Sequence, residues 1–87
     1  MNDKAREFTK EIGMLCSIFR KYKLKKTLRE LSEQTHVKIS TLSAFEHGKS
    51  TNMELLYKYL VSCETKEQEH YLIGIIVATM KSNVGGY

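Results

Sequence analysis

Residues 27–49, TLRELSEQTHVKISTLSAFEHGK, restrict the fold more than any other stretch of the chain. They predict two short helices joined by a tight turn, because apolar side chains recur at helical spacing on both sides of a polar break. Helices this short bury too little apolar surface to be stable alone, so further helices must pack behind them. Apolar residues of this stretch include Leu28, Leu31, Val37, Leu42 and Phe45.

A first helix beginning at Asn2 or Asp3 is expected to supply part of that support. Apolar residues follow each other at spacings of four and three, which predicts a single stripe facing the core. Arg20 falls on the opposite, polar side, and Leu24 is expected to point inward after the helix. The stripe comprises Phe8, Ile12, Leu15, Phe19 and Tyr22.

Capping signals set the boundaries of the later helices. Thr27 with Glu30 three residues on matches a capping box, and Thr65 begins a second box. Gly48 ends the third helix, where a positive φ costs glycine little, and Asn52 caps the fourth. The expected helices after the first span about 28–34, 39–47, 53–62 and 66–81.

These elements predict an all-α fold, a compact bundle of about five helices that contains a helix-turn-helix. A chain of 87 residues forms one small domain. We expect that domain to cover residues 1–81, with the helix-turn-helix at 27–47 and a flexible tail at 82–87.

The last helix carries apolar residues on more than one face, although a surface helix in a small monomer needs only one. The surplus predicts a homodimer, with Gly74 and Ala78 allowing close approach of a partner helix. The alternatives are a fully buried central helix or a sheet-like segment, since β-branched residues are frequent here. The residues expected in the dimer interface are Leu72, Ile73, Ile76, Val77 and Met80.

The net charge of +4 is concentrated around the central stretch. Residues 20–49 hold eight Lys or Arg against three Glu, a local net of +5, and the rest of the chain is at −1. A basic patch on a nearly neutral domain favours a polyanionic partner, although a solvated lysine surface gives the same pattern.

Several other classes of protein are disfavoured. Cys16 and Cys63 are far apart and lack the spacing of a zinc site or a disulfide scaffold, so we expect no metal. The N-terminus has no apolar signal region, and the longest apolar run, 72–77, is far short of the roughly 20 residues that span a bilayer. We therefore expect a cytoplasmic protein with no membrane partner.

Enzymatic activity is also not expected. The three histidines, His36, His47 and His70, lie in a turn, at a helix end and on an exposed helix face, without a nucleophile or carboxylate pair beside them in sequence. His36 is readily explained by a turn position with left-handed backbone geometry. No phosphate-binding loop or hydrolase motif is present. We expect no cofactor and no small-molecule ligand.

A helix, a tight turn and a second helix on a basic surface are typical of helix-turn-helix DNA-binding proteins. The segment LRELSEQT-HV-KISTLSAFEHGKS, within residues 15–60, resembles the Cro/Xre-type (lambda-repressor-like) family. The resemblance implies a bacterial or phage transcriptional regulator that binds double-stranded DNA as a dimer on a two-fold operator, in association with the nucleoid. The positions that match are Thr27, Leu31, Val37, Leu42, Phe45, Glu46, Gly48 and Lys49.

The resemblance also implies which residues contact DNA. The third helix would lie in the major groove, and Thr27, Lys38 and Lys49 would contact phosphates. Arg29 and the lysines at 23, 25 and 26 are added as phosphate contacts on charge and position alone. The residues implied to face the bases are Ile39, Ser40, Thr41, Ser43 and Ala44.

Three positions depart from the family pattern. His36 replaces the usual turn glycine, Leu28 stands where glutamine is frequent, and Ile39 occupies a position that is usually polar. The expected reading face has no Arg, Asn or Gln, which are the strong base readers, so specificity should be modest or should depend on DNA shape. An apolar spot at Leu28 and Ile39 also fits a rival function, a protein-binding module or antirepressor. The basic cluster favours DNA.

Overall fold

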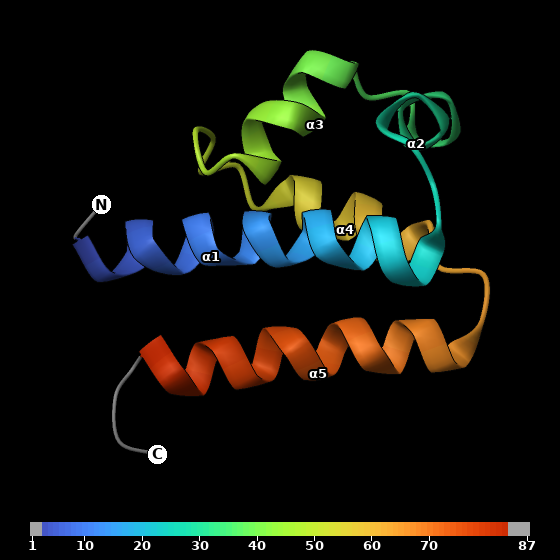
Figure 1. Cartoon of the computed structure of the whole chain (residues 1–87). Helices are drawn as coiled ribbons and strands as arrows, with labels where there is room; N and C mark the ends of the chain where they lie inside the picture. Colours follow the sequence, from blue (N-terminus) through green and yellow to red (C-terminus); the bar gives the residue numbers. More distant parts are fainter. Residues whose placement is uncertain (1–2, 84–87) are drawn as a thin grey trace.

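The structure is a computed structural model that describes residues 3–83 of the chain. Over this range every regular element is helical, and the predicted all-α bundle containing a helix-turn-helix is confirmed (Figure 1). The elements are α1 Asp3–Phe19, the π-helical turn η1 Arg20–Leu24, α2 Leu28–Thr35, α3 Ile39–Glu46, α4 Glu54–Val61 and α5 Lys66–Asn83. Ser82 and Asn83, which were expected in a flexible tail, are the last residues of α5. Asn2, proposed as one possible cap, and the remainder of the tail lie outside the described residues.

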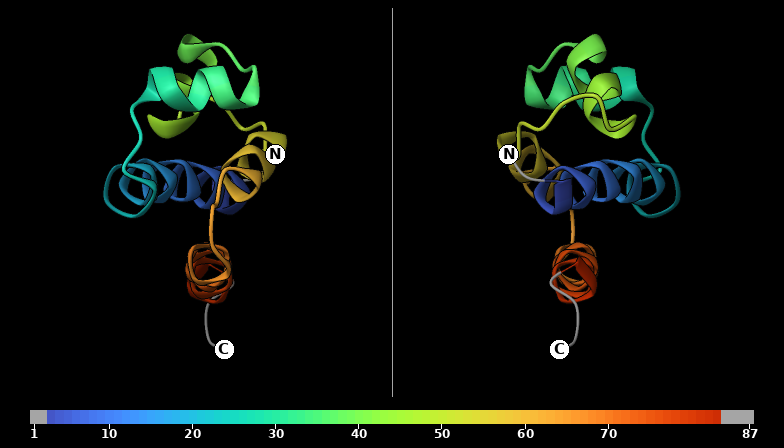
Figure 2. Two further views of the ribbon diagram at one scale, coloured as in Figure 1. Left: turned by 90° about the vertical axis from the view of Figure 1, so that its right-hand side faces the viewer. Right: turned by 90° about the vertical axis from the view of Figure 1, so that its left-hand side faces the viewer.

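Helix α1 is the central layer of the molecule. The helix-turn-helix and α4 pack on one side of it, and α5 runs antiparallel to it on the other side (Figure 1). Figure 2 shows α5 almost end-on, as a separate layer beyond α1. The buried apolar core comprises Ile12, Cys16, Phe19, Leu24, Leu31, Leu42, Phe45, Leu55, Tyr59 and Leu72.

Gly13 explains how closely α1 and α3 approach each other. A Cβ at this position would overlap the backbone carbonyl of Phe45, so only glycine fits the contact. Glycine inside a helix costs stability relative to alanine. The structure shows that the loss permits a backbone-to-backbone contact between the two helices.

The turn η1 changes the register at the end of α1. A π-helical turn contains one residue more than an α-helical turn, so side chains late in η1 rotate away from their α-helical directions. Tyr22 was expected in the core stripe, but it is 71% exposed. Arg20 was expected on the polar side, but it is buried, with 6% exposed, because helical spacing places it on the same side as the buried Thr9 and Cys16. Leu24 is buried as predicted.

The first capping prediction is confirmed in full. Thr27 Oγ1 accepts from Glu30 N at 3.1 Å, and Thr27 N donates to the Glu30 carboxylate at 2.9 Å. These hydrogen bonds lower the pKa of Glu30 below its usual value. Asn52 caps α4, since its Oδ1 accepts from Glu54 N at 3.0 Å.

The second capping box forms only in part. Thr65 Oγ1 accepts from Gln68 N at 3.1 Å as expected, but the Gln68 side chain reaches past Thr65 and accepts from Glu64 N at 2.7 Å. Gln68 Nε2 also donates to the carbonyl of Lys23 at 3.2 Å, which ties the start of α5 to η1.

Candidate nucleic-acid interface

The turn between α2 and α3 sets the angle at which α3 leaves the core. His36 ends α2 with a φ of 62°, the left-handed geometry expected from the sequence, and its N–H donates to Ser32 O at 2.8 Å. Gly48 ends the segment after α3 with a φ of 73°. Both positive-φ positions match the predicted boundaries of the helix pair.

Helix α3 has one buried side and one exposed side. Leu42, Phe45 and Glu46 are buried against α1 and α4. Ile39, Ser40 and Thr41 are exposed, and Ser43 and Ala44 are half-buried. No side chain caps the first turn at Lys38, so the backbone N–H groups there carry the partial positive charge of a helix N-terminus toward solvent.

A buried ion pair joins α3 to the end of α1. The Arg20 guanidinium donates from Nε and Nη2 to the two Glu46 carboxylate oxygens, at 2.8 and 2.9 Å, and Tyr59 Oη donates to Glu46 at 2.6 Å. Arg20 Nη1 also donates to the carbonyl of Lys26 at 2.9 Å. The network therefore connects η1, α3, α4 and the segment that leads into α2.

The pKa values of this network follow from its contacts. Burial alone would raise the pKa of Glu46, but hydrogen bonds from Arg20 and Tyr59 and the attraction of the guanidinium hold that pKa below its usual value. Burial and the bond to Glu46 raise the pKa of Tyr59. Burial also raises the pKa of Cys16 to about 12, with a further contribution from the Glu46 charge. Glu46 therefore stays ionised, and Cys16 is an inert core thiol at neutral pH.

Comparison with known proteins supports the geometry. A helix-turn-helix family model matches residues 18–69, which is more than half of the chain. The chain belongs to the Cro/C1-type helix-turn-helix family. It is a DNA-binding helix-turn-helix regulator, of a domain type that is not enzymatic. No curated protein and no solved structure matches it.

The expected phosphate contacts of this helix-turn-helix separate into two groups. Lys25, Arg29, Lys38 and Lys49 have exposed side chains, and Thr27 is exposed as well. These residues lie at the start of α2 and at both ends of α3. They remain the candidates for contact with the DNA backbone.

Lys26 and Lys23 are placed differently. The Lys26 ammonium is turned inward, and its side chain is 16% exposed. It donates to the Gln34 side chain and lies 3.4 Å from both the Glu64 carboxylate and Ser62 O. The Lys23 ammonium lies over the Tyr71 ring, 4.4 Å from its centroid. Both lysines hold α5 and the end of α4 to the rest of the domain.

The apolar spot expected at Leu28 and Ile39 is smaller than the sequence indicated. Leu28 is half-buried and packs against the core, so it supports α2 from within. Ile39 is 41% exposed at the start of α3. Of these two side chains, only Ile39 is therefore exposed.

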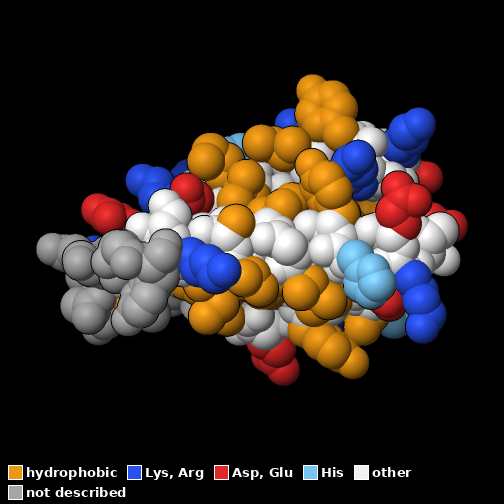
Figure 3. Space-filling view, turned by 90° about the horizontal axis from the view of Figure 1, so that it is seen from below, with side chains coloured by type: hydrophobic (Ala, Val, Ile, Leu, Met, Phe, Trp, Pro, Cys, Tyr) orange, Lys and Arg blue, Asp and Glu red, His pale blue; other side chains and the backbone are white. Residues whose placement is uncertain are grey.

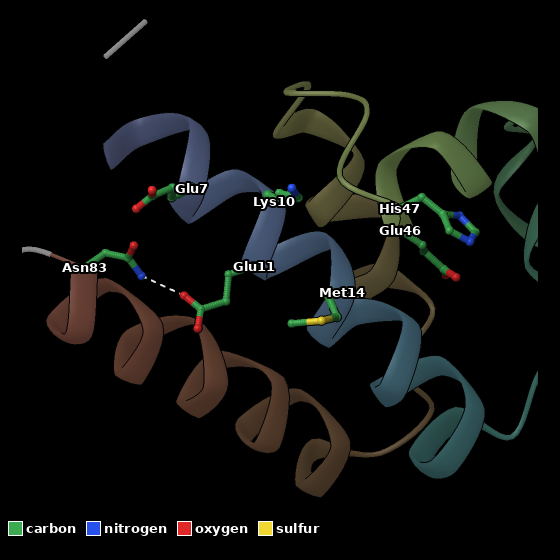
Figure 4. Close-up of a pocket in the computed structure, with 7 residues that line it drawn as sticks. All are labelled: Glu7, Lys10, Glu11, Met14, Glu46, His47 and Asn83. Carbon is green, nitrogen blue, oxygen red and sulfur yellow. Dashed lines mark hydrogen bonds between the residues drawn. The ribbon is translucent and has the colours of Figure 1, made fainter. Parts of the chain in front are cut away.

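Two surface hollows meet at the C-terminal end of α3. One, of about 230 Å³, is lined by Ser40, Ser43, Ala44, His47 and Lys49, and it lies on the exposed side of the recognition helix. The other, of about 550 Å³, runs between α1 and the end of α5, where Asn83 donates to Glu11 at 2.8 Å (Figure 4). His47 borders both. From the sequence, His47 was placed only at a helix end. Its spacing of seven from Ser40 could have indicated that both side chains lie on the same face of α3.

The expected dimer residues on α5 are also divided. Leu72 is 1% exposed and belongs to the core of the monomer, and Ile76 is half-buried against that core. Ile73, Val77 and Met80 are exposed at 46%, 44% and 51%. Figure 3 shows apolar side chains on both flanks of α5.

Among residues 3–83, none of the helices has the length and apolar character needed to cross a bilayer.

Proposed function

We propose that this protein is a sequence-specific transcriptional regulator of the bacterial or phage type, which inserts α3 into the major groove and binds a two-fold operator as a dimer. The observation that carries the proposal is the outward-facing first turn of α3. Lys38, Ile39, Ser40 and Thr41 are all exposed there, although Leu42 directly after them is fully buried. A helix held by one side and open on the other suits insertion into a groove.

The chemistry of the reading face supports moderate discrimination. Serine and threonine hydroxyls both donate and accept hydrogen bonds, so they distinguish bases weakly. The exposed Ile39 side chain and the half-buried Ala44 methyl suit contact with thymine methyl groups. The remaining specificity would come from the shape and deformability of the operator.

Selection of bound sequences from a random double-stranded DNA pool, at near-physiological salt, tests the proposal. The expected result is a two-fold motif with half-sites about one helical turn apart. Salt-sensitive binding without a motif would contradict sequence specificity, because phosphate contacts alone produce that behaviour. A motif with a single half-site would contradict the dimer.

The dimer part of the proposal places a second copy against α5. Ile73, Val77 and Met80 follow one another at spacings of four and three, which aligns them along one side of the helix. They stay exposed because α5 packs chiefly against α1. Gly74, beside this stripe, has open space where a Cβ would lie, which leaves room for a partner helix.

A protein-binding role is the second candidate, and the exposed Ile39 side chain favours it. An apolar residue at the entry to α3 fits a protein partner as well as a thymine methyl. The Ile39→Gln substitution separates the two functions. A regulator should keep DNA affinity and change base preference near that residue. A protein-binding module should show no DNA motif with either residue.

A further inference from the structure

The ring of His47 is held in a defined tautomer. Its Nδ1 lies 2.8 Å from the backbone carbonyl oxygen of Ser43 and 3.3 Å from the Ser43 hydroxyl. A carbonyl oxygen can only accept, so Nδ1 must carry the proton in this contact. The other nitrogen of the neutral ring, Nε2, is then a hydrogen-bond acceptor.

His47 also lies on the reading side of α3. Ser40, Ser43, Ala44 and His47 are related by spacings of three, four and seven, so they share one helix face. They line the hollow of about 230 Å³, together with Lys49. His47 is exposed, and its bond to Ser43 uses Nδ1, so among the described residues Nε2 has no hydrogen-bond partner.

DNA offers few partners to an acceptor of this kind. Phosphate and sugar oxygens of the duplex backbone are themselves acceptors, so a neutral Nε2 cannot hydrogen-bond to them. In the major groove the donors are the exocyclic amino groups, N4 of cytosine and N6 of adenine. The tautomer of His47 therefore matches a base edge rather than the backbone.

We propose that His47 is a specificity-determining residue that accepts a hydrogen bond at Nε2 from the amino group of an adenine or cytosine. The inference rests on the proposed function, since it requires α3 in the major groove. It adds a directional acceptor to a face whose other polar groups are hydroxyls. The Ser43 hydroxyl lies 3.3 Å from Nδ1, beside the proposed contact.

The test measures how the wild type and His47→Ala bind the selected operator. It then repeats the measurement on operators in which one base lacks its amino group. Purine replaces an adenine, or 2-pyrimidinone replaces a cytosine. At one position in each half-site, the analogue should weaken wild-type binding about 3- to 10-fold, the effect of a single hydrogen bond. The same replacement should leave His47→Ala binding unchanged, which makes the coupling specific to that pair. His70→Ala is the matched control, because His70 is an exposed histidine on α5, across α1 from the recognition helix.

Three outcomes are distinguishable. Loss of the analogue effect in His47→Ala alone supports the inference. If His47→Ala weakens binding equally on all operators and no analogue couples to it, the residue contacts the backbone and the inference is wrong, although the proposed regulator stands. If the wild type selects no motif, the proposed function itself fails, and this inference fails with it.

Discussion

At the scale of single residues, the Arg20–Glu46 pair is the main constraint on the recognition helix. Both side chains are nearly buried, at 7% and 2% exposed, and every strong contact of Glu46 comes from outside α3. A buried ion pair contributes little net stability when it is complete, but removing one partner leaves an uncompensated charge. We infer that the pair fixes where α3 lies more than how stable the domain is.

Glu46→Gln should therefore lower the free energy of unfolding by about 3–5 kcal/mol, because it leaves the Arg20 guanidinium buried without a countercharge. Urea denaturation measures the change. Glu33→Gln, on the exposed side of α2, is the control and should fall within about 0.5 kcal/mol of the wild type.

The same variant should change the acid limb of the stability profile. The pKa of Glu46 is lower in the folded protein than the usual value of a glutamate side chain, so the folded state binds this proton less readily than the unfolded state. The contribution of ionised Glu46 to the free energy of unfolding is complete above the pKa of the unfolded state. It is lost as the pH falls through the pKa of the folded state. With Glu46→Gln, the free energy of unfolding should fall less steeply as the pH is lowered. Parallel acid profiles for the two proteins would show that Glu46 is not the group responsible.

Single-residue environments were the least predictable part of the molecule. A charge such as Arg20 is normally assigned to the surface, and its partner lies 26 positions along the chain, beyond the reach of helical spacing. Gly13 looked like a local defect because the backbone it contacts belongs to another helix. Such features depend on tertiary packing, which local pattern does not encode.

At the scale of elements, α2, α3 and α4 could be predicted to within one or two residues. Their limits depend on capping residues and on Gly48, and these act through contacts within four residues. The turn η1 could not be predicted, because one additional residue in a turn leaves no mark on composition. That residue turned Tyr22 away from the core stripe in which it was expected.

Adjacent lysines should therefore behave differently in DNA binding. Lys25→Gln should reduce the slope of log affinity against log salt by about 1, since it removes one exposed phosphate contact. Lys26→Gln should leave the slope unchanged and should lower the free energy of unfolding by about 1 kcal/mol, because it removes the contacts to Gln34 and Glu64. Filter binding over a salt series, with parallel urea denaturation, checks both. Equal slopes for Lys25→Gln and the wild type would remove Lys25 from the DNA interface.

At the scale of the whole molecule, the order of layers decides what is available to a partner. With α1 in the middle, α3 and α5 lie on opposite sides of the domain (Figure 1). The sequence predicted surplus apolar surface on α5 but not its direction, because direction depends on which face meets α1. The structure assigns Leu72 to the core and leaves Ile73, Val77 and Met80 outside.

Val77→Glu should convert the proposed dimer into a monomer and weaken binding to a two-fold site, since it places a charge within the exposed stripe of α5. Ile18→Glu is the control, an equally exposed apolar residue on α1. Sedimentation at tens of micromolar protein reads the oligomeric state. A wild type that is already monomeric there would refute the α5 dimer, and dissociation by Ile18→Glu instead would move the interface to α1.

The π-helical turn also gives the chain a site that tolerates a change in length. Because η1 holds one residue more than an α-helical turn, loss of one of its exposed residues, such as Tyr22, would let α1 continue as a regular helix and still bring Leu24 to the core. Elsewhere in α1, a deletion would rotate all later inward side chains by about 100°. Between α1 and the helix-turn-helix, we therefore expect the domain to lose one residue without disturbing the position of α3.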